Sequence, residues 1–159
     1  MPIRDYPFIA VRGGRTFAVR TPASKPQLWV RIRNPHSDSN LSAVSLACVD
    51  TGADQCMIPA PVAVRLGHNL TAVKPIPVNT ASGKANAYPH TCRIEIRGVL
   101  PDGRPNLTRV LHTIPDAAVH CSESLPIVLL GRKGLFDLFD LWIRYPERVF
   151  SIQRPRARP

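Results

Sequence analysis

Residues 45–59, Ser-Leu-Ala-Cys-Val-Asp-Thr-Gly-Ala-Asp-Gln-Cys-Met-Ile-Pro, place a short polar turn between two apolar runs. The run that ends at Val49 has the length and composition of a strand that is buried on both faces. Asp, Thr and Gly then follow, and Asp and Gly favour turns because Asp accepts local backbone hydrogen bonds and Gly tolerates unusual backbone angles. The segment therefore predicts a strand at 44–49 that delivers Asp50, Thr51 and Gly52 to a turn.

An Asp in such a turn has two interpretations. Its carboxylate can simply accept hydrogen bonds from nearby backbone N–H groups. It can also be one of two adjacent carboxylates that share a proton, one of which activates a water as the other protonates a carbonyl. The chain holds one Asp-Thr-Gly, and Asp102-Gly103 lacks the hydroxyl residue between them. A catalytic role therefore needs Asp50 of a second copy of the chain.

Other strands and turns are predicted along the chain. Leu28, Val30 and Ile32 alternate with polar residues, so one face of the strand at 28–33 is apolar and the other carries the arginines. Hairpins are expected around Gly13-Gly14 and between residues 75 and 97. Further strands are predicted at 92–97, 107–114, 126–131, 141–144 and 148–152, and short helices at 61–67 and 133–139.

Length and composition favour one β-rich domain. The chain has 159 residues, of which 44% are apolar, and its 17 prolines and 9 glycines are spread without a repeat. We expect an N-terminal extension or hairpin at residues 1–26, a folded domain at 27–153 and a basic Pro/Arg tail, expected to be flexible, at 154–159.

The chain is strongly basic, with 21 Lys and Arg against 11 Asp and Glu and a formal net charge of +10. Such an excess raises nucleic acid as a partner. No stretch combines basic and aromatic residues in a nucleic-acid-binding motif, and Arg154, Arg156 and Arg158 belong to the tail. Nucleic acid is therefore not the expected partner.

The cysteines and histidines do not indicate a metal site. Cys48, Cys56, Cys92 and Cys121 show no C-x-x-C spacing, so reduced and mostly buried thiols are expected. His90 with Cys92, and His120 with Cys121, lack the paired spacing of a zinc site. The sequence predicts neither a metal nor a cofactor.

The N-terminal residues lack the charged and apolar regions of a signal peptide, and no apolar run reaches 18 residues. We therefore expect a soluble, cytoplasmic protein without a membrane span.

Asp50-Thr51-Gly52-Ala53-Asp54, together with the downstream Leu129-Leu130-Gly131-Arg132, resembles the retropepsin-like aspartic proteases, single-domain relatives of the retroviral proteases. The resemblance covers about residues 27–152. It implies an all-β, mainly antiparallel closed barrel with one or two short helices, which acts as a two-fold symmetric homodimer with a shared active site and no cofactor.

The resemblance assigns roles to the turn. Asp50 would be half of the catalytic dyad, and the Thr51 hydroxyl would hydrogen-bond across the dimer axis. Gly52 would allow a tight turn beneath the carboxylate that a side chain would obstruct. Ala53 and Asp54 would line the cleft, where an extended peptide binds as an added strand.

Two further elements are implied by the family. Asp54 would pair with Arg132, which follows Gly131, and this ion pair would tie the active-site loop to the last helix. Thr80-Ala81-Ser82-Gly83 lies where the family has its flap, so Ser82 and Gly83 would contact substrate. This segment lacks the multi-glycine tip of the retroviral enzymes. Val30, Ile58, Ala85 and Val128 are candidates for side chains that set cleft specificity.

The function implied is that of an aspartic endopeptidase, which hydrolyses peptide bonds of a peptide or protein substrate through a water activated by the two Asp50 carboxylates. Two alternatives remain open at the level of sequence. The fold could serve as a catalytically weak peptide-binding or dimerisation module, since fold does not establish function. Less favoured is a basic β-domain that binds nucleic acid.

Overall fold

The structure is a computed structural model that describes residues 2–12, 15–17, 24–80 and 82–155. The expected turn at Gly13-Gly14, residue Ala81 of the expected flap, and Arg156 and Arg158 of the tail lie outside the described residues.

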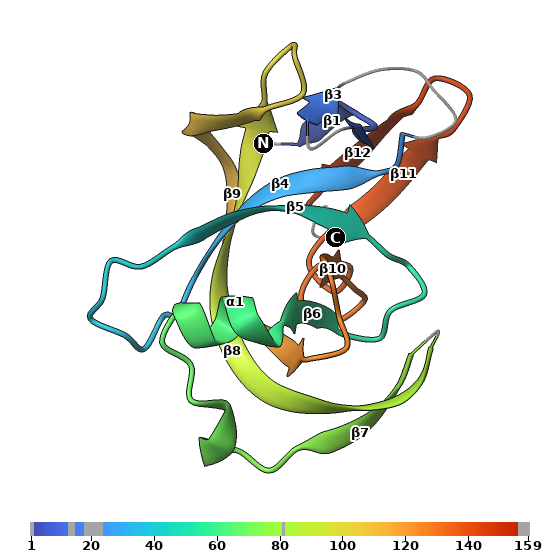
Figure 1. Ribbon diagram of the computed structural model, residues 1–159. Coiled ribbons are helices and arrows are strands. Elements are labelled where there is room, and N and C mark those ends of the chain that lie inside the picture. The colour runs from blue at the N-terminus through green and yellow to red at the C-terminus, as the bar shows by residue number, and fades with distance from the viewer. Residues whose placement is uncertain (1, 13–14, 18–23, 81, 156–159) are drawn as a thin grey trace.

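A closed β-barrel forms the centre of the molecule (Figure 1). Neighbouring strands follow the order β4, β5, β10, β6, β9 and β8, and β8 pairs back with β4 to close the sheet. Most pairings are antiparallel, whereas β10 with β5 and β6 with β9 are parallel. The barrel strands are β4 (Gln27–Arg33), β5 (Ala43–Val49), β6 (Cys56–Pro59), β8 (Gly83–Val99), β9 (Pro105–Ser122) and β10 (Val128–Leu130).

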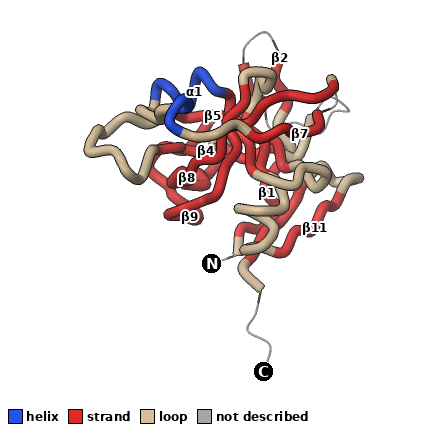
Figure 2. The backbone as a smooth tube through the Cα atoms, turned by 90° about the horizontal axis from the view of Figure 1, so that it is seen from below, coloured by secondary structure: helices blue, strands red, loops and turns tan. Residues whose placement is uncertain are grey.

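Smaller elements surround the barrel, and Figure 2 shows how strands dominate the chain. The helix α1 (Ala60–Arg65) and the 3₁₀ turn η1 (Leu70–Ala72) follow β6, and β7 (Ile76–Thr80) extends the sheet beyond β8. A second sheet joins β1 (Ile3–Pro7), β12 (Val149–Gln153) and β11 (Asp140–Arg144), and β2 (Ala10–Arg12) pairs with β3 (Arg15–Phe17). The expected all-β, mainly antiparallel barrel with short helices is confirmed. No helix among the described residues is long and apolar enough to cross a membrane.

The alternating pattern of β4 is confirmed in the core. Leu28, Val30 and Ile32 are fully buried, whereas the residues between them are partly exposed. The barrel interior is filled by such side chains from every strand, since successive residues of a strand point to opposite faces.

The expectation that β5 is buried on both faces is wrong. Ala43, Ala47 and Val49 face the core, but Val44 is 41% exposed and Cys48 is half-buried. The outer face of β5 is only partly covered by other described residues, so its apolar residues remain at the surface of a single chain.

The expected helix at 133–139 is also wrong, because this segment is a series of turns. Gly134 has a φ of 98°, which a right-handed helix does not contain. Leu135 and Phe139 are buried nonetheless, so the segment contributes to the core without helical hydrogen bonding.

The N-terminal strand is tied to the barrel through one phenol. Tyr6 lies in β1, which pairs with β12, and its hydroxyl donates to the Arg97 carbonyl at 3.2 Å and accepts the Trp29 N–H at 3.2 Å. The ladder between β4 and β8 ends at Val30 and Ile96, so this hydroxyl connects the next position of the two strands that close the barrel. Burial raises the pKa of Tyr6 to about 12.

We expect Tyr6→Phe to lower the free energy of unfolding by about 1–3 kcal/mol, because Trp29 N–H and the Arg97 carbonyl would each lose a partner in a buried setting. Urea denaturation measures the difference. The matched control is Tyr145→Phe, since Tyr145 is 58% exposed and its change should be close to neutral. Equal effects of both substitutions would contradict the bridging role.

His68 predicts a dependence of stability on pH. Its ring is buried, with Nε2 3.3 Å from Cys92 Sγ and the His90 ring 4.9 Å away. Burial, followed by the neighbouring His90 and His36, lowers the pKa of His68 to about 4. Between pH 6.5 and 4 the unfolded chain binds a proton that the native site does not, so the free energy of unfolding should fall as pH falls.

His68→Gln should reduce this loss of stability between pH 6.5 and 4, as measured by urea denaturation at several pH values. Carboxylates titrate in the same range, so the quantity of interest is the difference in slope between the variant and the parent. His36→Gln, at an exposed position, is the control and should keep most of the parental slope. A parental slope in His68→Gln would show that another group is responsible.

Candidate active site

Asp50 lies directly after β5, in a turn whose geometry is fixed by backbone hydrogen bonds. Its N–H donates to the Leu130 carbonyl at 3.0 Å, so the start of the turn is fastened to β10. The carboxylate Oδ1 accepts the Gly52 N–H at 2.9 Å, and the Asp50 carbonyl accepts the Ala53 N–H at 3.3 Å. These bonds hold the carboxylate in a defined orientation at the end of the strand.

The second half of the turn is held by the segment after β10. The Arg132 N–H donates to the Ala53 carbonyl at 2.8 Å, and the Lys133 N–H donates to the Asp54 carbonyl at 3.0 Å. The Lys133 carbonyl accepts the Cys56 N–H at 3.1 Å, which continues the contact into β6. The Asp50 turn is therefore bonded at both ends to one neighbouring segment.

Gly131 is the position at which this packing excludes a side chain. A Cβ atom there would lie 2.3 Å from the Gln55 carbonyl oxygen and 2.7 Å from the Ala53 carbonyl oxygen, closer than Cβ atoms are found in real structures. Both contacts are with backbone, so a side-chain rotation cannot relieve them. Only glycine allows the two segments to approach this closely.

Gly52 has a weaker steric role than the sequence predicts. Its backbone is not in the left-handed region, and a Cβ atom would meet only the Asp50 Oδ1 atom, at 3.3 Å. A side chain at 52 would press on the carboxylate without blocking the turn itself. Gly52 is therefore constrained by the position of the Asp50 oxygen.

Asp54 and Arg132 form an ion pair between Oδ1 and Nη2. In a single chain the two side chains are 75% and 64% exposed respectively. An exposed pair contributes about 0–1 kcal/mol to stability, so its contribution here is mainly to orient two neighbouring loops. Because residues 133–139 form turns, the pair joins the Asp50 loop to a turn segment and not to a helix.

The segment expected to be a flap is a hairpin of β7 and β8. At its tip Thr80 Oγ1 donates to the Gly83 carbonyl at 2.7 Å and lies 3.1 Å from Ser82 Oγ. Gly83 has a φ of 119°, which explains glycine at this position. The tip and the turn after β5 extend toward the same side of the barrel in Figure 1. No hydrogen bond links Ser82 or Gly83 to the Asp50 turn in the part of the chain that is described.

Comparison with known proteins agrees with this geometry. Residues 42–102 match the family model of aspartyl proteases, a range that includes the Asp50 turn and the hairpin. The fold matches the crystal structure of a retropepsin-like aspartic protease from Rickettsia conorii, with a TM-score of 0.52 at 19% identity, over 95% of this chain and 96% of that chain. The chain therefore has a retropepsin-like fold, and its residues 42–102 match the aspartyl protease family.

A second similar structure is the EIAV protease complexed with the inhibitor HBY-793. It has a TM-score of 0.43 and 15% identity, over 70% of this chain and 86% of that chain. No curated protein matches the chain.

Most of the side chains expected to set cleft specificity lie in the core. Val30, Ile58 and Val128 are at most 1% exposed, whereas Ala85 in the hairpin is half-buried. The first three fill the barrel interior because they occupy inward positions of β4, β6 and β10. They cannot contact a peptide in this arrangement.

Sequence reasoning missed the part played by Gln55 and Lys133, which form a parallel bridge beside the turn. Their contribution is made by backbone atoms, which leave no side-chain signature. Cys56 adjoins the same bridge, and burial raises the pKa of its thiol to about 11. Its thiol is packed in the core and held in the neutral form, unlike a reactive cysteine, whose pKa is lowered.

The four cysteines are free thiols, and Cys56, Cys92 and Cys121 are buried. Within the described residues, no group of three or more His, Cys, Asp and Glu side chains is arranged to hold a metal ion.

Gly131→Ala should lower the free energy of unfolding by about 1–3 kcal/mol, because the backbone of residues 53–55 must move to admit the methyl group. Gly52→Ala is the matched control, with an expected loss of about 0.5 kcal/mol or less, since the added methyl group would meet only the Asp50 Oδ1 atom, at 3.3 Å, and a small shift relieves this contact. Guanidinium denaturation of both variants provides the test. A larger loss for Gly52→Ala would reverse the assignment of the two glycines.

Proposed function

We propose that this chain is a homodimeric aspartic endopeptidase whose active site takes one Asp50 from each of two copies. The observation that carries the proposal is a rigidly held Asp-Thr-Gly turn in a chain that contains one such tripeptide. The turn is open to solvent, with Thr51 and Gly52 exposed and Asp50 half-buried. A second copy would cover it across a two-fold axis.

The chemistry needs two carboxylates in contact. Two such groups about 3 Å apart cannot easily both ionise, so the pair shares one proton. The ionised member removes a proton from a water that attacks the peptide carbonyl carbon, and the protonated member donates its proton to the carbonyl oxygen. In the resulting tetrahedral intermediate the Asp50 that took the water proton donates it to the nitrogen, the other Asp50 takes a proton from a hydroxyl, and the C–N bond breaks to release the amine. The two Asp50 residues exchange the roles of base and acid in the process.

The remaining residues of the turn would position this dyad. The Thr51 hydroxyl makes no hydrogen bond within the described part of one chain, and we assign it to a bond with the partner copy. Gly52 donates its N–H to Asp50 Oδ1 and leaves room for the carboxylate. The backbone of Ala53 and Asp54 would bind an extended peptide.

Gly131 and Arg132, which follow β10, would hold the Asp50 turn in position. The Gly131 contact fixes the distance between the turn and β10, and the Asp54–Arg132 pair fixes the orientation of the loop edge. Ser82 and Gly83, at the tip of the β7–β8 hairpin, would close over the bound peptide. Such a hairpin excludes water from the cleft and adds contacts to the substrate backbone.

Asp50→Asn should reduce kcat/KM for cleavage of an unstructured protein by at least about 10²–10⁴-fold, the contribution of general acid–base catalysis, and should leave the dimer intact. Cleavage is measured with a fluorogenic casein and the dimer by analytical ultracentrifugation. Asp102→Asn is the matched control, because Asp102 lies in the β8–β9 turn and pairs with Arg104 at 2.6 Å. This control should retain parental activity and remain resistant to chelators.

Mixed dimers test whether the site is shared. Co-expression of the parent with Asp50→Asn under two affinity tags yields heterodimers, and these should be as inactive as the variant. Heterodimers with half the parental activity would place a complete site in each copy. Cleavage by Asp50→Asn at the parental rate would exclude the aspartic mechanism.

A further inference from the structure

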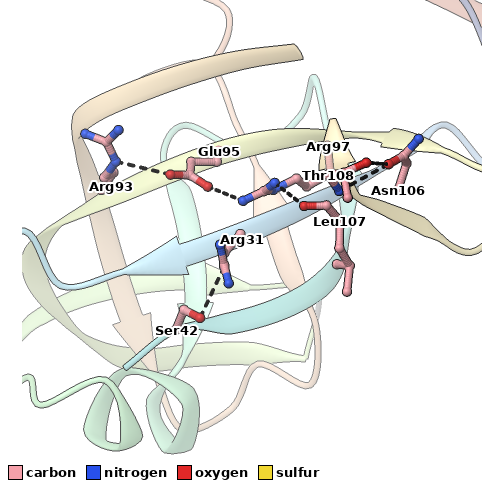
Figure 3. A network of polar contacts seen from close by, with 8 residues as sticks. All are labelled: Arg31, Ser42, Arg93, Glu95, Arg97, Asn106, Leu107 and Thr108. Carbon is pink, nitrogen blue, oxygen red and sulfur yellow. Dashed lines mark hydrogen bonds and ion pairs between the residues drawn. The ribbon is translucent and has the colours of Figure 1, made fainter. Parts of the chain in front are cut away.

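A group of arginines lies on the outer face of the barrel, where β4 pairs with β8 (Figure 3). Cross-strand partners there are Arg31 with Glu95 and Arg33 with Arg93. The residues between them, including Ile32 and Ile94, face the core. Alternation therefore directs the charged side chains to the same outer face.

The single carboxylate of this group is already neutralised. Glu95 is 8% exposed and Arg97 is 4% exposed, and the two form an ion pair between Oε2 and Nη2. Arg97 is held further by donation from Nη1 to the Leu107 carbonyl at 2.7 Å. Glu95 Oε1 also accepts from Arg93 Nε, at the longer distance of 3.4 Å. Glu95 is thus shared between Arg97 and Arg93, and among the described residues neither Arg31 nor Arg33 has an ion-pair partner.

Arg33 and Arg93 face each other as like charges. Directly opposite residues of an antiparallel pair have Cβ atoms about 5 Å apart, and like charges at this position are destabilising. The Arg33 Nε is buried and has no hydrogen-bond partner. Asp116 lies on the adjacent β9 but forms no ion pair with these arginines among the described residues. A negatively charged hydrogen-bond acceptor between the two guanidinium groups would offset their repulsion and would give Arg33 Nε a partner.

The surroundings hold these side chains in place. Arg31 Nε donates to Ser42 Oγ at 3.2 Å, which leaves its two Nη atoms available. His36 Nε2 lies 2.9 Å from Thr91 Oγ1, so the loop after β4 is tied to β8 beside the Arg33–Arg93 pair. Arg93 keeps 43% of its side chain exposed, so a ligand can reach it from solvent.

We propose that Arg31, Arg33 and Arg93 form a binding site for an oxyanion of the phosphate type. Guanidinium groups donate two parallel hydrogen bonds to phosphate oxygens, and a tetrahedral oxyanion can accept from several forks at once. The phosphate can be a free ion or part of the phosphodiester backbone of a nucleic acid. The site is separate from the Asp50 turn, because Arg31 pairs with Val44 at the start of β5, whereas Asp50 follows the end of that strand.

The experiment uses the full chain and two probes. Inorganic phosphate is titrated while the arginine Nε–H signals are followed by ¹⁵N NMR, and a fluorescein-labelled oligothymidylate is titrated by anisotropy at several salt concentrations. Shifts of the Arg33 and Arg93 signals with phosphate support the site directly. Binding of the oligonucleotide alone supports a phosphodiester as the source.

The double variant Arg33→Gln/Arg93→Gln should weaken binding of phosphate and of the oligothymidylate by at least about tenfold each. For the oligothymidylate, the slope of log K against log salt should fall in magnitude by about 1 for each arginine removed. Arg33→Lys keeps the charge and loses the fork, and it should weaken phosphate binding measurably. The charge-matched control is Arg4→Gln/Arg65→Gln, at two exposed positions on β1 and α1. Thermal unfolding of each variant confirms that it is folded.

Three results overturn the proposal. The first is that neither phosphate nor the oligothymidylate binds the parent. The second is that the control double variant loses as much affinity as Arg33→Gln/Arg93→Gln, which would reveal a general effect of net charge. The third is tighter binding of polyglutamate than of the oligonucleotide, which would indicate a carboxylate ligand such as an acidic peptide.

Discussion

The close contact between Gly131 and the carbonyls of Ala53 and Gln55 is the constraint on which the active-site region depends. β10 runs parallel to β5 and antiparallel to β6, so this short strand lies between the strand that precedes Asp50 and the strand that follows the turn. The contact and its backbone hydrogen bonds leave the Asp50 carboxylate little freedom. Preorganisation of this kind is what a reaction driven by two adjacent carboxylates requires.

The predictability of the fold varied with the strength of local patterns. β4 could be predicted from its alternation because one face is buried and the other is not. The turns at 133–139 could not, because Leu135 and Phe139 have helix-like spacing, whereas the positive φ of Gly134 and its close approach to Cys56 are visible only in the fold. The length of β8 was also hidden, since residues 92–97 alternate and were predicted as a strand, whereas the small and polar residues that precede them give no such pattern.

The site shows the same division between side chains and backbone. Asp50 and the Asp54–Arg132 ion pair could be predicted because their side chains carry the motif. The bridge between Gln55 and Lys133 could not, because any residue can supply these backbone atoms. The arginines of the outer face lie on two strands, and their register is decided by barrel closure, a long-range property that no local window of sequence contains.

β8 is a cantilever. From Tyr88 onward it pairs with β9, and farther along with β4 as well, whereas residues 83–87 pair as a strand with β7 and meet β9 through the hydrogen bond from Ser122 Oγ to the Asn86 carbonyl. Residues 83–87 span about 17 Å at the usual rise of a β-strand. The hairpin joins the barrel near Tyr88, beside fully buried Ala87. We therefore expect the hairpin to bend near Tyr88. The packing of Ala87 in the core limits how far the hairpin tip can move.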